Sequence, residues 1–420
     1  MFQLMLKDNV CAEFDITDSS IATELTSFKV VGILPINCTE RNFVKWLESR
    51  NASKHREHLS AYLNKLGIFS TYGYLKVTHG ISINDCFWVR DSAEAVSWKD
   101  VSPYTNEYNE VIQRLAFDGV GLYGEELSPT SPEFGTSGTF DKCWIREDGN
   151  IFMIKRGSDI ASNSGLEPYC EVLASQVFSS MRAGIPYKLI KYHDKIASKC
   201  KLFNNEDRSF IPYGNLGRST DTASILRFYD DLNSDIFRRI LVCDALTLNI
   251  DRHIGNHGVF YSSEEQRILS AAPGYDYNLS MCPYLTRDDF ADFPANYVKY
   301  MPKFGMSFIA VAREVMTPSI RRDLINLKGI KLELPFYTKE FQKERCEWMS
   351  ELVNTQIENI LSGGEIKVPE FHVDKISNCM RYRLKLGLTE DQWVTEVPRL
   401  MKIFEISRME ELEQEIAKLI

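Results

Sequence analysis

Apolar positions along the chain change their spacing, and the spacing predicts where strands and helices lie. Up to about residue 115, short apolar stretches with β-branched residues, such as MFQLMLKDNVCAEFDI and FKVVGILPI, predict a few strands. Residues 143–158 alternate on two arms around Asp148-Gly149, which predicts a β-hairpin. Residues 184–213 have the pattern of a second hairpin, and the apolar run of residues 267–273 predicts one further short strand.

Helical spacing dominates the rest of the chain. Apolar residues recur three and four positions apart in residues 39–68, 167–181 and 221–248, and again from residue 304 to the C-terminus. Gly363-Gly364 separates the last helical segment from those before it. The order of strands and helices therefore predicts an α/β (α+β) protein.

A chain of 420 residues exceeds a typical single core, so several parts are expected. Residues 119–143 are rich in Gly, Ser, Thr and Pro and mark a long loop. We expect an accessory N-terminal region over residues 1–118, a small β-rich lobe over residues 119–203 and a mostly helical large lobe over residues 204–420.

The composition is that of an ordinary globular protein, with 44% hydrophobic and 25% charged residues. No apolar window is long enough for a membrane span, and the N-terminus lacks a basic segment followed by a long apolar one. The ten cysteines are scattered singly, which favours reduced thiols over a disulfide framework or zinc site. With a net charge of -9 as well, we expect a cytoplasmic protein that binds neither membranes nor nucleic acid directly.

The residues with the most chemical potential lie between positions 240 and 280. A buried helix runs into a polar loop with Asp251 and Asn256, and Asp276 follows a short strand. Phosphoryl transfer needs a carboxylate that accepts the proton of the attacking hydroxyl and oxygen ligands for magnesium. Asp251 and Asn256 have the five-residue spacing that these two roles have in protein kinases, although the literal HRD and DFG strings are absent. On these residues alone, a polar loop that caps a helix or holds a structural metal fits equally well.

The strings N-I-D-R-H-I-G-N-H-G (249–258) and A-P-G-Y-D (272–276) resemble the signature of HipA-like kinases, an N-x-D-x-H-x-x-N loop followed by P-x-Y-D. The resemblance implies a bilobal, protein-kinase-like fold and ATP- and Mg²⁺-dependent phosphorylation of Ser or Thr in a protein substrate. Asp251 would be the base, Asn256 and Asp276 would bind Mg²⁺, and His253 would lie at the nucleotide. Members of the family often act as toxins beside a small antitoxin, which is the partner implied here.

Upstream residues follow the order of the kinase template. Lys155 ends the second arm of the predicted hairpin, where the template places the lysine that holds the nucleotide phosphates. Glu171 lies on the helix that follows, and we expect it to form an ion pair with Lys155. Glu167 is the competitor for this role, but it precedes Pro168 at the start of the helix.

Two further segments are expected to contact the nucleotide. A glycine-rich loop can bring backbone N–H groups close to phosphates, and the strand that leaves the small lobe ends at the adenine-binding hinge of the template. The residues assigned to these two segments are Gly135, Thr136, Ser137 and Gly138 for the loop, and Lys201, Leu202 and Phe203 for the hinge.

The same glycine-rich loop is predicted to carry a switch. In HipA-like kinases a serine of the corresponding loop can be autophosphorylated, and Thr136, Ser137 and Thr139 are the hydroxyls available in this chain. A phosphate there would add about two negative charges to a site built for phosphates and would expel the loop.

Two other functions fit the same motifs. A pseudokinase would bind nucleotide without transferring phosphate and would act as a regulatory module, with the N-terminal region as its interaction surface. A small-molecule or lipid kinase would share the lobes and the magnesium site. Transfer of label from ATP, and the identity of the labelled acceptor, distinguish the three.

Overall fold

The computed structural model describes residues 1–18, 22–51, 59, 62–63, 67–119, 131–136, 138–159, 165–371 and 373. They belong to two compact units. The first comprises Met1–Pro283 and Met301–Gly364, and the second comprises Tyr284–Tyr300 and the residues from Glu365 onward. The predicted boundaries at residues 118 and 203 fall inside the first unit and stay predictions. In the part of the chain that is described, no helix is both long and apolar enough to cross a membrane.

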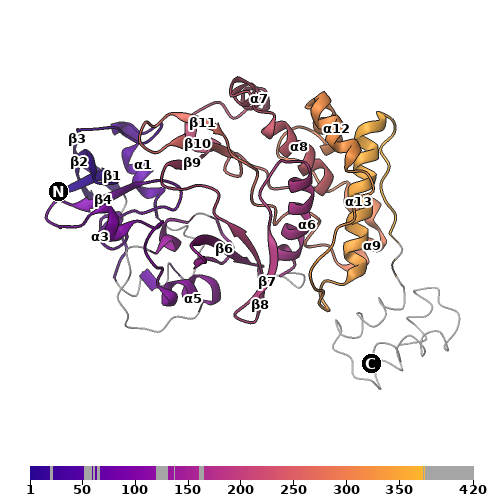
Figure 1. The fold of residues 1–420 in the computed structure, drawn as a ribbon, viewed down its shortest axis with the longest axis horizontal. Coiled ribbons are helices and arrows are strands. Elements are labelled where there is room, and N and C mark those ends of the chain that lie inside the picture. The colour runs from indigo at the N-terminus through magenta and orange to yellow at the C-terminus, as the bar shows by residue number, and fades with distance from the viewer. Residues whose placement is uncertain are drawn as a thin grey trace, which may run out of the picture. The chain divides into compact units, whose positions relative to one another are not determined.

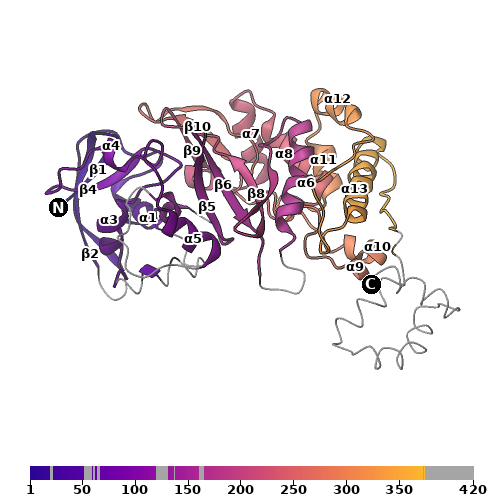
Figure 2. The ribbon, with the colours of Figure 1, turned by 60° about the horizontal axis from the view of Figure 1, so that its bottom comes forward.

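The N-terminal region is built on a four-stranded antiparallel sheet, as the strand-rich pattern predicts (Figures 1 and 2). Its strand order is β3-β2-β1-β4, and buried and half-buried positions alternate along much of β2, so that one face packs on an apolar core. Among the residues described in this region, α1, α3, α4 and α5 accompany the sheet. The elements are β1 (Phe2–Leu6), β2 (Asn9–Asp18), β3 (Thr23–Val30), α1 (Phe43–Glu48), α3 (Thr71–Thr78), β4 (Phe87–Asp91), α4 (Trp98–Val101) and α5 (Glu110–Asp118).

Both predicted hairpins form, and they join into a second antiparallel sheet of order β5-β6-β8-β7. Asp148 and Gly149 have φ of 50° and 73°, and His193 and Asp194 have φ of 46° and 61°. Two successive residues with positive φ make the turn whose twist matches that of paired strands. The elements are β5 (Lys142–Glu147), β6 (Asn150–Arg156), β7 (Lys188–Tyr192) and β8 (Lys195–Lys201), with the buried helix α6 (Glu167–Ser180) between the hairpins.

A third sheet has the strand order β11-β10-β9. In the sequence, β9 precedes the polar loop of residues 249–256, and β10 and β11 follow it. Its strands are β9 (Arg208–Pro212), β10 (Gly258–Ser262) and β11 (Ile268–Ala271). The predicted strand corresponds to β11, whereas β10 was not expected, because five residues directly after a polar loop give no clear alternation. β10 pairs with both neighbours and so holds the end of that loop in the sheet.

The remaining part of the first unit is mainly helical, as predicted (Figure 1). It contains α7 (Thr222–Asp231), α8 (Ile236–Thr247), α11 (Phe308–Glu314), α12 (Pro318–Asn326) and α13 (Lys343–Ser362). α13 ends at Gly363 with φ of 69°, which is the predicted break. The second unit contains α9 (Arg287–Ala291) and α10 (Phe293–Tyr297), and the helices predicted beyond residue 373 lie outside the described residues.

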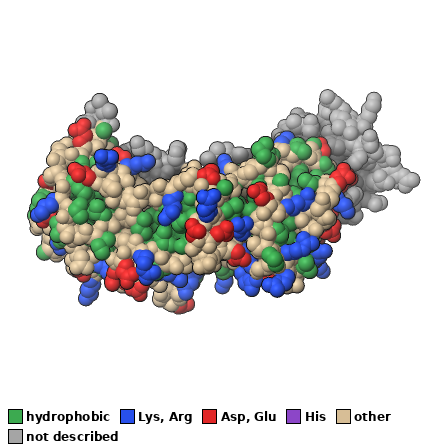
Figure 3. Space-filling view, turned by 90° about the horizontal axis from the view of Figure 1, so that it is seen from above, with side chains coloured by type: hydrophobic (Ala, Val, Ile, Leu, Met, Phe, Trp, Pro, Cys, Tyr) green, Lys and Arg blue, Asp and Glu red, His purple; other side chains and the backbone are tan. Residues whose placement is uncertain are grey.

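The fold class expected from the sequence is therefore confirmed: the described residues combine three antiparallel sheets with a mostly helical part. On the face shown in Figure 3, Lys and Arg side chains are interspersed with Asp and Glu side chains over the described residues. The expected lack of direct nucleic-acid binding stays a prediction.

Candidate active site

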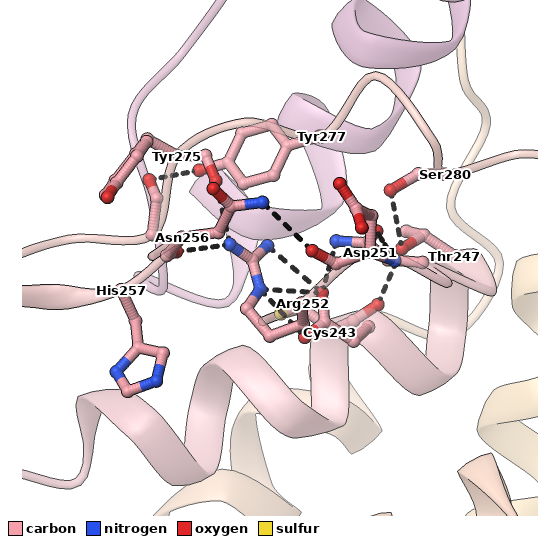
Figure 4. A network of polar contacts seen from close by, with 12 residues as sticks. Cys243, Thr247, Asp251, Arg252, Asn256, His257, Tyr275, Tyr277 and Ser280 are labelled. Carbon is pink, nitrogen blue, oxygen red and sulfur yellow. Dashed lines mark hydrogen bonds and ion pairs between the residues drawn. The ribbon is translucent and has the colours of Figure 1, made fainter. Parts of the chain in front are cut away.

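The buried helix α8 positions the first half of the site. All but two of its residues are buried, and it ends at Leu248, whose φ of 51° turns the chain into the 249–256 loop. The Oδ1 of Asn249 accepts a hydrogen bond from the backbone N–H of Asp251 at 3.1 Å. The Asp251 carboxylate is thereby held at the loop surface with 34% of its side chain exposed, where an outside group can reach it (Figure 4).

Asn256 and His253 are both placed beside Asp251. The amide nitrogen of Asn256 donates to the Asp251 carbonyl at 2.9 Å, which leaves the Asn256 Oδ1 as the atom that can face a cation. His253 accepts from the Gly255 N–H through Nδ1, so its Nε2 carries the proton in the neutral ring. That Nε2 lies 3.9 Å from an Asp251 carboxylate oxygen. The loop thus gathers a carboxylate, an amide oxygen and an imidazole.

The second half of the site is a charged cluster around the buried Lys155, near the end of β6. Its ammonium lies 2.6 Å from Glu171 on α6 and 2.7 Å from Asp276. The expected Lys155–Glu171 ion pair is therefore present in the structure. Glu171 also accepts from the Ser198 hydroxyl and from the Tyr277 N–H, so the helix carboxylate contacts β8 and the 272–277 loop as well.

Charge and burial separate the two acids that face each other across the site. Burial alone would raise the pKa of Asp276, but the nearby ammonium groups of Lys155 and Lys142 outweigh it and lower that pKa to about 2. The pKa of Asp251 is raised above its ordinary value, by desolvation first and also by the charge of Asp276. Asp276 therefore stays ionised, while Asp251 is the more basic carboxylate of the two.

Glu167, the competing acid, has a different role. It is the first residue of α6, and its carboxylate accepts from the N–H and hydroxyl of Ser158 and from the Gly165 N–H. Both of those residues flank the start of the helix. Glu167 thus organises the connection between β6 and α6 and leaves Lys155 to Glu171.

Two residues of the predicted phosphate loop, Gly135 and Thr136, pack against other segments, and their contact with the nucleotide stays a prediction. A Cβ on Gly135 would collide with the backbone carbonyl of Ile81, so glycine is required here by the accessory region. Thr136 is buried, and its hydroxyl donates to the Pro132 carbonyl at 2.7 Å and accepts from the Trp144 indole at 2.8 Å. The sequence does not show which residues lie next to Gly135 in space. It therefore cannot distinguish a glycine required by packing from a glycine that lets the backbone approach a phosphate.

The rest of that loop keeps its assignment as a prediction. Gly138 is exposed with φ of 92°, and a Cβ at this position would lie 2.5 Å from the ammonium of Lys142. Ser137 lies outside the described residues, and Thr139 is exposed. Of the three hydroxyls proposed for the switch, that of Thr136 is buried and makes two hydrogen bonds, and autophosphorylation of the loop stays a prediction.

The predicted hinge lies at the end of β8. Lys201 is its exposed last residue, and the N–H of Leu202 donates to the Ile151 carbonyl at 2.9 Å. The ring of Phe203 packs near that of Tyr275, with centroids 5.5 Å apart. The hinge segment therefore reaches from the β6 side of the site to the 272–277 loop, and its adenine contact stays a prediction.

Sequence analysis missed Lys142, Asp244 and Arg252. Lys142 is buried directly opposite Lys155 in the β5–β6 register, and counting outward from the Asp148-Gly149 turn would have found it. Arg252 and Asp244 form a buried ion pair at 3.0 Å. A charged residue inside the apolar helix α8 was the available signal for Asp244 alone.

The oxygen ligands present suit Mg²⁺. No group of three or more His, Cys, Asp or Glu side chains within the described ranges could hold a metal unaided. Protein sites for Mg²⁺ in phosphoryl transfer commonly supply only one or two carboxylates and leave the other positions to phosphates and water. The ionised Asp276 and the Asn256 amide oxygen match that donor set.

Comparisons with known proteins give matches among solved structures alone. No protein-family model matches the chain, and no curated protein matches it. Among solved structures, it is similar to the Helicobacter pylori proinflammatory kinase CtkA, at 17% identity and a TM-score of 0.42, over 55% of this chain and 92% of that one. It is also similar to HipA of Shewanella oneidensis MR-1, solved with HipB and its operator DNA, at 12% identity and a TM-score of 0.46, over 86% and 98% of the two chains. The chain thus has HipA and the kinase CtkA as structural neighbours.

Proposed function

We propose that this protein is an ATP- and Mg²⁺-dependent kinase that transfers the γ-phosphoryl group to a Ser or Thr hydroxyl of a protein. The observation that carries the proposal is the buried Lys155, which bridges Glu171 and Asp276, two acids that lie far apart in the sequence. A buried lysine between a helix carboxylate and a loop carboxylate is the arrangement that positions nucleotide phosphates in kinases.

Asp251 has the properties required of the catalytic base. Its carboxylate is half-exposed, so a substrate hydroxyl can approach it, and its raised pKa makes it a better proton acceptor than an ordinary aspartate. The hydroxyl would donate its proton to Asp251 while its oxygen attacks the γ-phosphorus, and the bond from that phosphorus to the bridging oxygen would break so that ADP leaves. The imidazole of His253 beside Asp251 stabilises the ionised carboxylate when it is protonated.

The charged cluster around Lys155 would hold the nucleotide. Lys155 is poised to contact the phosphates, and Asn256 and Asp276 would hold Mg²⁺. When bound, the metal would neutralise phosphate charge. The two acids would have different roles: Asp276 stays ionised and would bind the metal, whereas Asp251 would accept a proton.

The proposal includes the acceptor and setting implied by the sequence resemblance. The substrate is a protein, the compartment is the cytoplasm and the candidate partner is a small antitoxin. The half-exposed position of Asp251 supports an acceptor as large as a protein segment, because the carboxylate is not enclosed.

The test is phosphate transfer from γ-labelled ATP with Mg²⁺ to proteins of a cell lysate. Wild type should label protein Ser or Thr, and Asp251→Ala should not. Asp207→Asn should label normally, because the Asp207 side chain is 94% exposed and is not assigned to the base, the metal or the nucleotide. Nucleotide binding without label transfer would contradict the proposal and indicate a pseudokinase. Label confined to lipids or small molecules would replace the protein acceptor.

A further inference from the structure

Arg252 lies in the sequence between the proposed base, Asp251, and one proposed metal ligand, Asn256. Its side chain points into the protein and has several hydrogen-bond partners. It is 1% exposed, and its Nη1 donates to the backbone carbonyls of Asn256 at 2.6 Å and Tyr275 at 2.8 Å (Figure 4). These carbonyls belong to one proposed metal ligand and to the residue before the other, Asp276. A single nitrogen atom thus joins the 249–256 loop to the 272–277 loop.

The opposite edge of the guanidinium is fixed by Asp244 on α8. The Nε of Arg252 lies 3.0 Å from Asp244 Oδ2, and the same carboxylate accepts from the Asn249 amide at 2.8 Å. Asn249 in turn accepts from the N–H of Asp251. Asp251 and Asn256 are therefore each two hydrogen bonds away from Asp244, and so is Tyr275, the residue before Asp276.

We propose that Arg252, anchored by Asp244, is a positioning residue that sets the spacing between the two metal ligands, Asn256 and Asp276. The inference rests on the proposed kinase function and goes beyond it, since Arg252 touches neither nucleotide nor acceptor. Arginine suits the task because its planar group donates in several fixed directions at once. A lysine has one nitrogen, and it cannot hold the carboxylate and both carbonyls in this geometry.

The competing interpretation is that the pair only stabilises the fold. Arg239, which lies on α8 like Asp244, offers a matched control. It is also buried, donates to the Met181 carbonyl at 3.0 Å and pairs with Asp235 and Asp323 at 2.9 and 2.6 Å. None of its partners belongs to the two loops, so its loss should affect stability without changing the metal site.

The experiment compares Arg252→Lys with Arg239→Lys. Binding of Mn²⁺ to the protein loaded with a non-hydrolysable ATP analogue is measured by electron paramagnetic resonance, and analogue binding is measured separately with EDTA. For Arg252→Lys we expect the Mn²⁺ half-saturation to rise on the order of tenfold or more, as for changes to groups that orient metal ligands. Metal-free analogue binding should stay within about twofold, and Arg239→Lys should leave both values near wild type.

Catalysis provides the second readout. Arg252→Lys should lower kcat by about 10²-fold, the scale of a displacement near 1 Å, with less change in the KM for ATP. A wild-type Mn²⁺ half-saturation in folded Arg252→Lys, or an equal rise in Arg239→Lys, would overturn the inference. If Arg252→Lys does not fold, Asp244→Asn replaces it and should shift Mn²⁺ binding in the same direction, whereas an unshifted value there overturns the inference too. Failure of wild type to bind the analogue or transfer phosphate would instead reject the proposed function.

Discussion

The two halves of the candidate site differ in how firmly the protein holds them. In the Lys155 half, the lysine and Glu171 are buried, and the lysine pairs with both Glu171 and Asp276. The Asp251 half is a loop whose carboxylate and histidine are half-exposed and only 3.9 Å apart. The first half is therefore built around a lysine fixed between two acids, and the second leaves its side chains accessible to a second reactant.

The largest expected effect is on catalysis, and it comes from an acid of each half. Asp251→Asn should lower the transfer rate by about 10²- to 10⁴-fold, because the amide cannot accept the proton. Asp276→Asn should lower it by at least about 10³-fold, because a metal ligand is lost. Single-turnover rates with labelled ATP measure both, and near-normal turnover of either variant removes the assigned role.

A substitution in the Lys155 half should lower the stability of the protein much more than a substitution in the Asp251 half. Glu171→Gln breaks a buried ion pair and should lower the free energy of unfolding by about 3 kcal/mol, at the low end because Asp276 still pairs with Lys155. His253→Ala removes a half-exposed side chain and should change it by less than about 0.5 kcal/mol. Urea unfolding of both variants checks the contrast, and equal losses would show that the halves are held alike.

Gly135→Ala tests whether Gly135 is required for packing against Ile81 or for phosphate binding. The added Cβ would meet the Ile81 carbonyl, so the variant should lose about 1–3 kcal/mol of stability. The affinity of the folded variant for an ATP analogue should not change. Calorimetric melting and analogue titration separate the two effects, and a loss of affinity at unchanged stability would return Gly135 to the phosphate site.

The smallest expected effect is a shift in the pH dependence of transfer. The base must be ionised, and its pKa is raised by desolvation, so the acid limb should lie at higher pH than for an ordinary aspartate. The charge of His253 lowers the pKa of Asp251, so His253→Gln should move the limb to still higher pH. A limb that moves down, or does not move, would contradict the placement of the histidine charge at the base.

Local patterns were enough to predict much of the fold. The Asp148-Gly149 turn predicted the β5–β6 hairpin because glycine tolerates the positive φ that this turn needs. The apolar spacing predicted α6, α7, α8 and the helices from α11 to α13, but not α9 and α10. Lys155 and Glu171 were predicted as partners because the order of strand and helix limits which acids can reach the lysine.

The features that sequence could not reveal depend on tertiary contacts. Gly135 and Thr136 look like phosphate-loop residues until Ile81 and Trp144, from other segments, are placed beside them. Arg252 reads as an exposed loop charge, since its partner carbonyls belong to the backbone and carry no sequence signal. Such contacts must be seen in three dimensions.

The most direct test of the central claim is a crystal structure with a non-hydrolysable ATP analogue and Mn²⁺, in which anomalous scattering locates the metal. The account predicts one nucleotide whose phosphates contact Lys155, with metal coordinated by Asn256 Oδ1 and the Asp276 carboxylate and with Asp251 facing the terminal phosphate. A nucleotide bound elsewhere, or metal held without either ligand, would contradict the account.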